Sequence, residues 1–173
     1  MDIAYTIASG RGDTDLILQR TANMLIAEGF CTIGTVQINS EREDAGHCDM
    51  DIKVLPSGSI IRISQSLGRE AKGCRLDPSA LETAVAQVQQ AMAQGADCLI
   101  INKFGKHEAE GRGFRPLIAE ALSLGIPVLI GTNRLNLSAF DEFTEGLATN
   151  LRPEVDTLYA WLRNAVERRL MAA

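Results

Sequence analysis

The sequence predicts an α/β fold of three layers, in which helices cover both sides of a mainly parallel sheet and a β-hairpin is inserted. Two observations lead to this fold class. Short apolar segments alternate along the chain with longer segments whose apolar residues recur at helical spacing. Residues 97–101 form an almost uninterrupted apolar run, which is typical of a parallel strand buried on both faces. We expect that strand near the centre of the sheet.

The first half of the chain alternates as this fold class requires. Residues 3–8 are short and apolar and predict a strand, a glycine-containing loop follows, and the apolar spacing over residues 16–29 indicates a helix. Residues 31–38 are rich in β-branched side chains and predict a second strand. Residues 49–55 and 59–64 are expected to be extended, and the Pro-Ser-Gly sequence between them suits a tight turn. These two segments form the predicted β-hairpin.

The second half continues the alternation of helices and strands. Asp77 can cap a helix that begins with Pro78 and ends at Gly95. The remaining expected elements are the strand at residues 97–101, a helix over about residues 114–124, a strand at 126–130 and a last helix from 153. Residues 135–149 are expected to be irregular, with at most a short helix around Phe140.

Length and composition limit the classes of function. A chain of 173 residues with 46% hydrophobic residues has the size and apolar content of one domain, so we expect residues 1–173 to form a single domain. The net charge of -5 gives no reason to expect a nucleic-acid partner. The sequence has neither a basic signal region nor the roughly 20 apolar residues of a membrane-spanning helix, so no membrane span and a cytoplasmic location are expected.

The cysteines give no sign of a metal site. Cys31, Cys48, Cys74 and Cys98 form neither a C-x-x-C pair nor a recognised zinc pattern. We predict reduced thiols and no metal-ligating residues.

In a parallel sheet with helices on both faces, ligands bind at the carboxyl ends of the strands. This rule directs attention to the loops that follow Ala8, Ile101 and Ile130. The first and second of these loops carry the candidate functional residues.

The loop after the first strand has the position of a phosphate-binding loop. Its candidate ligand-binding residues are Ser9, Gly10, Arg11, Gly12, Asp13 and Thr14. Glycines let such a loop fold tightly, so that backbone N–H groups and the helix N-terminus point at an anion. The Walker A pattern is degenerate, because Asp13 stands where the lysine belongs and Thr14 keeps the hydroxyl position. Arg11 would have to supply the positive charge; alternatively, Asp13 or Thr14 only caps the helix.

The loop after the buried strand contains the candidates Asn102, Lys103, Lys106, Glu108 and Arg112. A Walker B strand ends in an aspartate for Mg²⁺, often followed by a glutamate that aligns water, and here these positions hold Asn102 and Lys103. An amide provides no charge and a lysine cannot act as the carboxylate base. Two alternatives stay open. One is a guanine-recognition motif N-K-x-D, which lacks its aspartate, and the other is a solvated, charged loop.

These motifs resemble those of the small P-loop nucleoside-triphosphatases of the thermophile and cancer-related type. Residues 102–108, NKFGKHE, match the glycine and the final glutamate of their D-E-I-G-x-x-E pattern but lack its two catalytic carboxylates. The segments CRLDP (residues 74–78) and NKFGKHEAEGRGF (residues 102–114) are more closely similar to a related bacterial domain family of unknown function, whose members have been seen near molybdenum-transport genes. The resemblance covers residues 1–130.

The resemblance implies a fold of the P-loop NTPase type and a small anionic ligand. That ligand would be a nucleoside phosphate with Mg²⁺ or a tetrahedral oxyanion such as molybdate, because a nest of N–H groups with Arg and Lys serves either. We expect the site to combine the loops after Ala8 and Ile101, assisted by Arg75 or Arg112.

Three functions follow from these residues. The first is a nucleotide- or oxyanion-binding protein with degenerate Walker motifs and impaired hydrolysis. The second is an active nucleoside-triphosphatase in which Lys103 replaces the missing lysine and Glu108 positions water. The third is a non-enzymatic partner of a transport or metallocofactor assembly, and a homo-oligomer is compatible with all three.

The two degenerate motifs also predict an exchange of charge. Asp13 stands where a lysine is expected, and Lys103 stands where an acidic residue is expected. If the two loops lie side by side, Asp13 and Lys103 should form an ion pair with the usual partners reversed.

Overall fold

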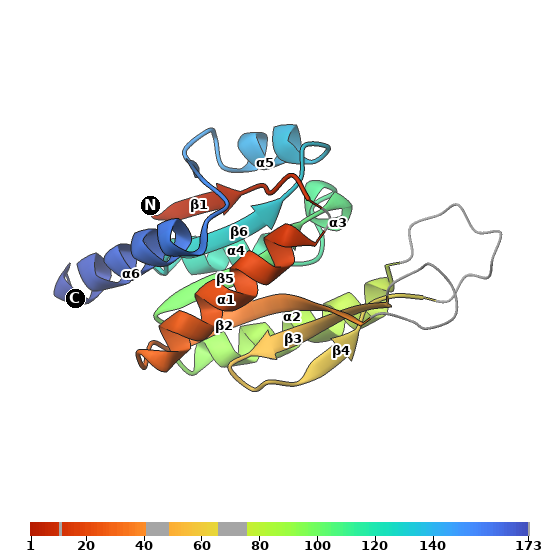
Figure 1. Ribbon diagram of the computed structural model, residues 1–173, viewed down its shortest axis with the longest axis horizontal. Coiled ribbons are helices and arrows are strands. Elements are labelled where there is room, and N and C mark those ends of the chain that lie inside the picture. The colour runs from red at the N-terminus through yellow and green to blue at the C-terminus, as the bar shows by residue number, and fades with distance from the viewer. Residues whose placement is uncertain (11, 41–48, 66–75, 173) are drawn as a thin grey trace.

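The computed structural model describes residues 1–10, 12–40, 49–65 and 76–172 (Figure 1). The strands are β1 (Ile3–Thr6), β2 (Thr32–Ser40), β3 (Asp49–Leu55), β4 (Ile60–Arg62), β5 (Cys98–Phe104), β6 (Val128–Thr132) and β7 (Thr149–Leu151). The helices are α1 (Asp13–Ala27), α2 (Pro78–Ala93), α3 (Lys106–Ala109), α4 (Arg115–Ser123), α5 (Leu137–Phe143) and α6 (Val155–Ala172).

The seven strands form one sheet in the order β4-β3-β2-β5-β6-β1-β7. The five strands from β2 to β7 in this order pair in parallel, and β3 and β4 extend the sheet as an antiparallel hairpin. The predicted fold class is therefore confirmed, including the hairpin. β5 is the central strand, and β1 lies close to it with only β6 between them, so both strands are away from the sheet edges as predicted.

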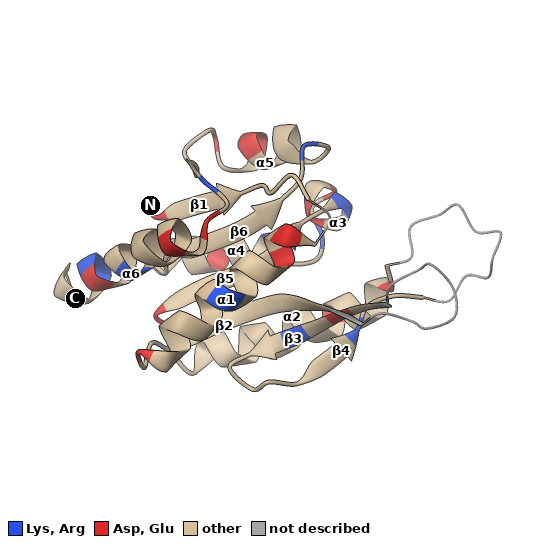
Figure 2. Cartoon of the chain, viewed as in Figure 1, with Lys and Arg blue, Asp and Glu red and all other residues tan. Residues whose placement is uncertain are grey.

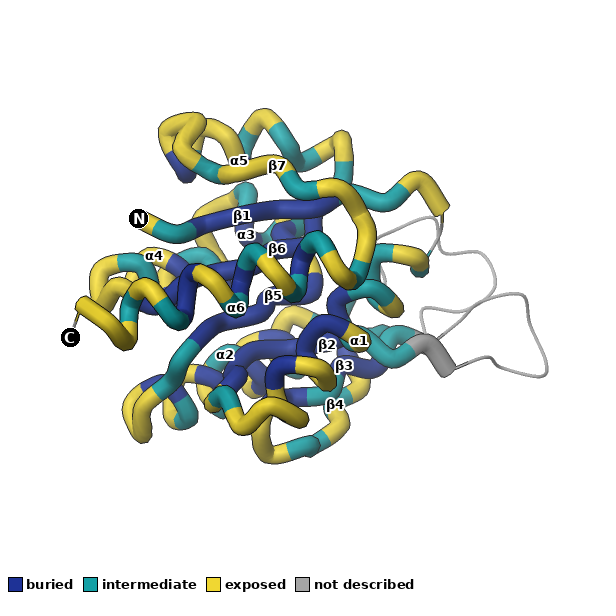
Figure 3. The backbone as a smooth tube through the Cα atoms, turned by 60° about the vertical axis from the view of Figure 1, so that its left-hand side comes forward, coloured by how far each residue is buried: buried dark blue, intermediate teal, exposed yellow. Residues whose placement is uncertain are grey.

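Helices cover both faces of the sheet, giving the predicted three layers. α1 and α6 pack on one face, whereas α2 and α4 pack on the other. Side chains of β5 alternate between the two cores, with Leu99 and Ile101 toward α2 and α4, and Cys98 and Ile100 toward α1 and α6. All four are fully buried, as the dark central strands of Figure 3 show. Among the described helices, none combines the length and the apolar composition that crossing a membrane requires.

The structure differs from the sequence-based expectation in four elements. β7 is not predicted by the sequence: it begins at the last residue of the segment expected to be irregular, its edge position leaves it largely exposed, and its sequence TNL lacks an apolar pattern. The four-residue helix α3 lies in the segment expected to be a charged loop. β5 continues to Phe104, so Asn102 and Lys103 belong to the strand and not to the loop after it. α6 begins at Val155, two residues after Pro153.

A glycine allows β2 to approach β5. Gly34 of β2 has a φ of +123°, and a Cβ atom built on it would overlap the carbonyl oxygen of Ile100 in β5. Both the backbone conformation and the neighbouring strand therefore require glycine at this position.

We predict that Gly34→Ala lowers the free energy of unfolding by about 3 kcal/mol or more, because the methyl group adds overlap with backbone to an unfavourable φ. Gly29→Ala is the matched control, since Gly29 has a φ of +91° but no atom within 4 Å of its Cβ position. The control should lose only about 1 kcal/mol. Urea denaturation of both variants measures the difference, and equal losses would contradict this account of the strand contact.

Candidate functional site

A cavity of about 590 Å³ lies at the carboxyl end of β5. Its walls come from β2 and β3, the start of α2, α3 with the loop after it, and the turn after β6. The carboxyl end of a central parallel strand is where α/β sheets bind ligands. The structure brings together five sequence-predicted residues around this cavity, namely Asn102, Lys103, Lys106, Glu108 and Arg112.

Glu108 organises the segment that carries these cations. Its side chain is only 3% exposed, and its two carboxylate oxygens accept backbone hydrogen bonds from both ends of the segment. Oε2 accepts from the N–H of Gly105 at 2.9 Å, and Oε1 accepts from the N–H of Phe114 at 3.1 Å. Buried carboxylates need such partners to stay ionised. The contacts give Glu108 a structural function, while its positioning of water stays a prediction.

The positive charges around the cavity are not equivalent. Lys106 Nζ lies 3.7 Å from a carboxylate oxygen of Glu110, and Arg112 pairs with the same carboxylate. The hydrogen bond from Arg112, together with the charge of Lys106, lowers the pKa of Glu110, so this carboxylate stays ionised at neutral pH. Lys103 is exposed, and among the described residues none forms an ion pair with it. Lys103 therefore contributes the charge that an anion could use.

Asn102 joins three elements and does not act as a free ligand. It is 4% exposed, its Nδ2 donates to Asp15 Oδ1 in α1 at 2.9 Å, and its Oδ1 accepts from the N–H of Gln37 in β2 at 2.9 Å. An aspartate at this position would place a second carboxylate against Asp15 and could not donate a hydrogen bond to it while ionised. The local contacts of this position therefore suit an amide and not a carboxylate.

His107 is among the residues that border the cavity, but its Nε2 does not face the cavity. This nitrogen is covered by protein atoms and has no hydrogen-bond partner among the residues that the structure describes. A buried nitrogen that has lost water and gained no partner costs free energy. A ligand in the cavity does not reach it, so we assign His107 no part in binding.

The loop after β1 forms a separate, smaller hollow of about 390 Å³. Ser9 and Asp13 line it together with Arg20 and Pro153. The carboxylate of Asp13 lies against Gly10, where a Cβ atom would overlap it. A carboxylate in this place repels an anion. The arrangement opposes the phosphate-binding use of this loop.

Helix capping by these side chains is not observed in α1 either. Gly12 is the N-cap residue, with a φ of 83°, and the cap has no side-chain hydrogen bond. Thr14 Oγ1 instead accepts from the N–H of Ala8 at 3.1 Å, which ties the start of α1 to the end of the β1 segment. One lone pair of the Thr14 hydroxyl is therefore used within the protein.

The predicted ion pair between Asp13 and Lys103 is not observed. β6 lies between β1 and β5, and no ion pair within the described part of the chain joins the two residues. Asp13 lines the hollow beside α1, whereas Lys103 lines the cavity beside α2. The carboxylate of α1 that does reach β5 is Asp15, and its partner there is the amide of Asn102.

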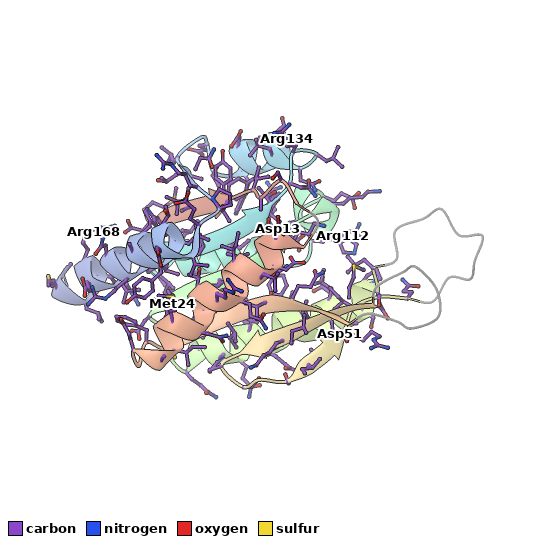
Figure 4. The ribbon with its side chains drawn as sticks, viewed as in Figure 1. Asp13, Met24, Asp51, Arg112, Arg134 and Arg168 are labelled. Carbon is purple, nitrogen blue, oxygen red and sulfur yellow. The ribbon has the colours of Figure 1, made fainter. Side chains whose placement is uncertain are left out.

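The candidate residues are thus divided between two places. Figure 2 shows acidic residues at the start of α1 and mixed charges around α3, and Figure 4 labels Asp13 and Arg112 in these two regions. Of the three loops at the carboxyl ends of the strands, those after β5 and β6 meet at the larger cavity. The loop after β6 contributes Asn133 and Asn136. Arg11 and Arg75 lie outside the described residues.

We predict that Glu108→Gln destabilises the segment between β5 and α4, because an amide has one acceptor oxygen where the carboxylate has two. The loss should be about 1–3 kcal/mol, the cost of a buried N–H left without its partner. Native-state hydrogen exchange should show faster exchange at Gly105 or Phe114. Glu120→Gln, on the exposed side of α4, is the control and should leave exchange at these amides unchanged. Unchanged protection in Glu108→Gln would contradict the assigned function of Glu108.

Comparison with known proteins gives a family and a relative. A family model described as "Protein of unknown function (DUF2478)" matches residues 3–161. The chain is 36% identical over 168 residues to the "Molybdenum import ATP-binding protein ModC 2" of Bradyrhizobium diazoefficiens. This alignment covers 96% of the chain but 18% of the relative, so the chain corresponds to a small part of that protein.

Two solved structures have a similar fold. The crystal structure of THEP1 from the hyperthermophile Aquifex aeolicus has a TM-score of 0.64 and 16% identity, covering 95% of this chain and 96% of that one. The solution structure of a human cancer-related nucleoside triphosphatase has a TM-score of 0.59 and 17% identity, covering 100% of both chains. The resemblance to small P-loop nucleoside-triphosphatases is confirmed for the fold.

Proposed function

This chain belongs to the DUF2478 family, and we propose that it binds a nucleoside phosphate or another oxyanion without hydrolysing it efficiently. The anion binds in the cavity at the carboxyl end of β5, not in the loop after β1. A P-loop NTPase-like fold and a relative named as an ATP-binding protein of molybdenum import support a nucleotide or molybdate as the ligand.

One observation carries the proposal: the cavity is bordered by Lys103, a cation that no described acidic side chain neutralises. Lys106 and Arg112 add N–H donors nearby, although both also contact Glu110. An ammonium group that keeps its charge available forms strong, charge-assisted hydrogen bonds with phosphate oxygens. Asp13 makes the alternative hollow less suitable for an anion.

Impaired hydrolysis follows from the same contacts. Phosphoryl transfer depends on neutralising the charge that spreads over the transferred group, usually by a lysine and Mg²⁺. The first loop holds Asp13 where that lysine belongs, and the hydroxyl of Thr14 is bonded to Ala8. Asn102 brings no charge to a metal. The residues therefore do not fit the usual Mg²⁺ site. The contacts of Glu108 are with backbone N–H groups, so they do not support the alternative in which Lys103 and Glu108 carry out hydrolysis.

The biological setting of the proposal is molybdenum transport. The relative is named for ATP-dependent molybdenum import, and the chain corresponds to 18% of its length. We infer that the chain works in the cytoplasm as a ligand-binding, non-catalytic partner of such an assembly. In this proposal, residues 1–173 form one domain that reports the presence of its anion to the transporter. The oligomeric state of the chain can be measured separately.

We predict that Lys103→Ala weakens the binding of orthophosphate, molybdate or AMP by about 10- to 100-fold, the value of one charge-assisted hydrogen bond. Arg20→Ala is the matched control, because Arg20 lines the other hollow. Isothermal titration calorimetry should give wild-type affinities for the control. A loss of affinity in Arg20→Ala, with no loss in Lys103→Ala, would place the site in the loop after β1 and contradict the proposal.

We also predict that purified protein hydrolyses ATP and GTP with Mg²⁺ at less than about 10⁻² s⁻¹, well below the roughly 10 s⁻¹ of a median enzyme. The rate is measured by phosphate release across the size-exclusion peak. Robust turnover that follows the protein peak and disappears in Lys103→Ala would support the active nucleoside-triphosphatase instead.

A further inference from the structure

The walls of the larger cavity have two chemically different parts. One part consists of the charged and polar groups around α3. The other is an apolar wall made by Met50, Ile52, Ile63, Leu76, Leu81 and Phe114. These six residues come from the hairpin, the segment before α2, α2 itself and the start of α4, and all belong to or pack against the core on that face of the sheet. The apolar wall is a continuation of the core into the cavity.

The size of the cavity exceeds the needs of a bare oxyanion. A volume of about 590 Å³ lies within the range of ~300–1,000 Å³ that is usual for sites of organic ligands. A phosphate or molybdate ion is fully satisfied by hydrogen bonds and cations and gains nothing from contact with apolar side chains. The apolar wall therefore indicates a ligand with an apolar or aromatic body in addition to its charge.

We propose that the ligand is an aromatic or heteroaromatic oxyanion ester whose oxyanion lies at Lys103 and whose ring lies against the apolar wall beside the hairpin. The inference rests on the proposed function, because it takes Lys103 as the anion-binding group. It goes further in assigning the ring to a surface formed by β3 and α2, on the face of the sheet opposite α1.

The test is isothermal titration calorimetry of the full chain with four probes: inorganic phosphate, phenyl phosphate, AMP and phenol. Phenyl phosphate should bind at least about tenfold more tightly than inorganic phosphate, because the ring buries its surface against the apolar wall. AMP should bind at least as tightly as phenyl phosphate, and phenol should bind weakly. This comparison needs no substitution and is therefore independent of any effect on folding.

A matched pair of substitutions locates the ring. Met50→Gln introduces a polar group of similar length into the wall and should lower the affinity for phenyl phosphate by about threefold or more, leaving inorganic phosphate unaffected. Met24→Gln is the control, since Met24 lies on the exposed side of α1 (Figure 4) and should change neither affinity.

The outcomes separate the two proposals. Equal affinities for phenyl phosphate and inorganic phosphate would overturn the aromatic ligand and leave the anion site intact. Equal losses for both probes in Met50→Gln would also overturn it, because the ring would then have no contact of its own. Phenol that binds as tightly as phenyl phosphate, or no binding of any anion, would overturn the proposed function itself.

Discussion

The carboxylate of Glu108 accepts hydrogen bonds from the backbone at both ends of the segment between β5 and α4, at Gly105 and at Phe114. Because this carboxylate is almost fully buried, backbone N–H groups take the place of water as its hydrogen-bond donors. His107 and Arg112 lie inside the segment that it closes, and Lys103 comes shortly before it. The positions of His107 and Arg112 therefore depend on one buried acid, whereas Lys103 is held by β5. The contacts of this glutamate are therefore structural: they close the segment beside the cavity.

A second set of contacts occupies the end of β5 that faces α1. The amide of Asn102 connects β5 to Asp15 of α1, so the strand end where a Walker B carboxylate would lie is occupied by structural hydrogen bonds. Gly131 of β6 allows Thr14 and the end of β5 to approach closely, since a Cβ atom there would overlap the carbonyl oxygen of Asn102. At this end of the sheet, Asn102 and Asp15 are hydrogen-bonded to each other, and Thr14 packs closely against Gly131. The cavity on the opposite face of the sheet keeps a cation without an acidic partner among the described residues, together with an apolar wall.

The sequence predicted the fold more completely than the site. The apolar run before Asn102 marked the central strand, and Asp77 with Pro78 marked the start of α2, because burial and capping leave local patterns. β7 left no such pattern, since at the edge of the sheet its residues stay largely exposed and need no apolar side chains. The cations of the second loop could be identified from their position after a buried strand. Their separation from Asp13 could not, because it depends on β6 lying between β1 and β5, which is a matter of strand order. The apolar wall was equally hidden, because residues such as Ile52 and Leu81 look like ordinary core residues in sequence.

The central claim is that the anion binds at the carboxyl end of β5 and not in the loop after β1. At 18.7 kDa the chain is small enough for assigned ¹H–¹⁵N correlation spectra, and a titration with inorganic phosphate reports directly on the amides near the anion. We expect concentration-dependent shifts at Phe104, Gly105 and Lys106, with Gly10 and Asp13 unchanged. Shifts confined to Gly10, Gly12 and Asp13, with none around Gly105, would contradict the claim.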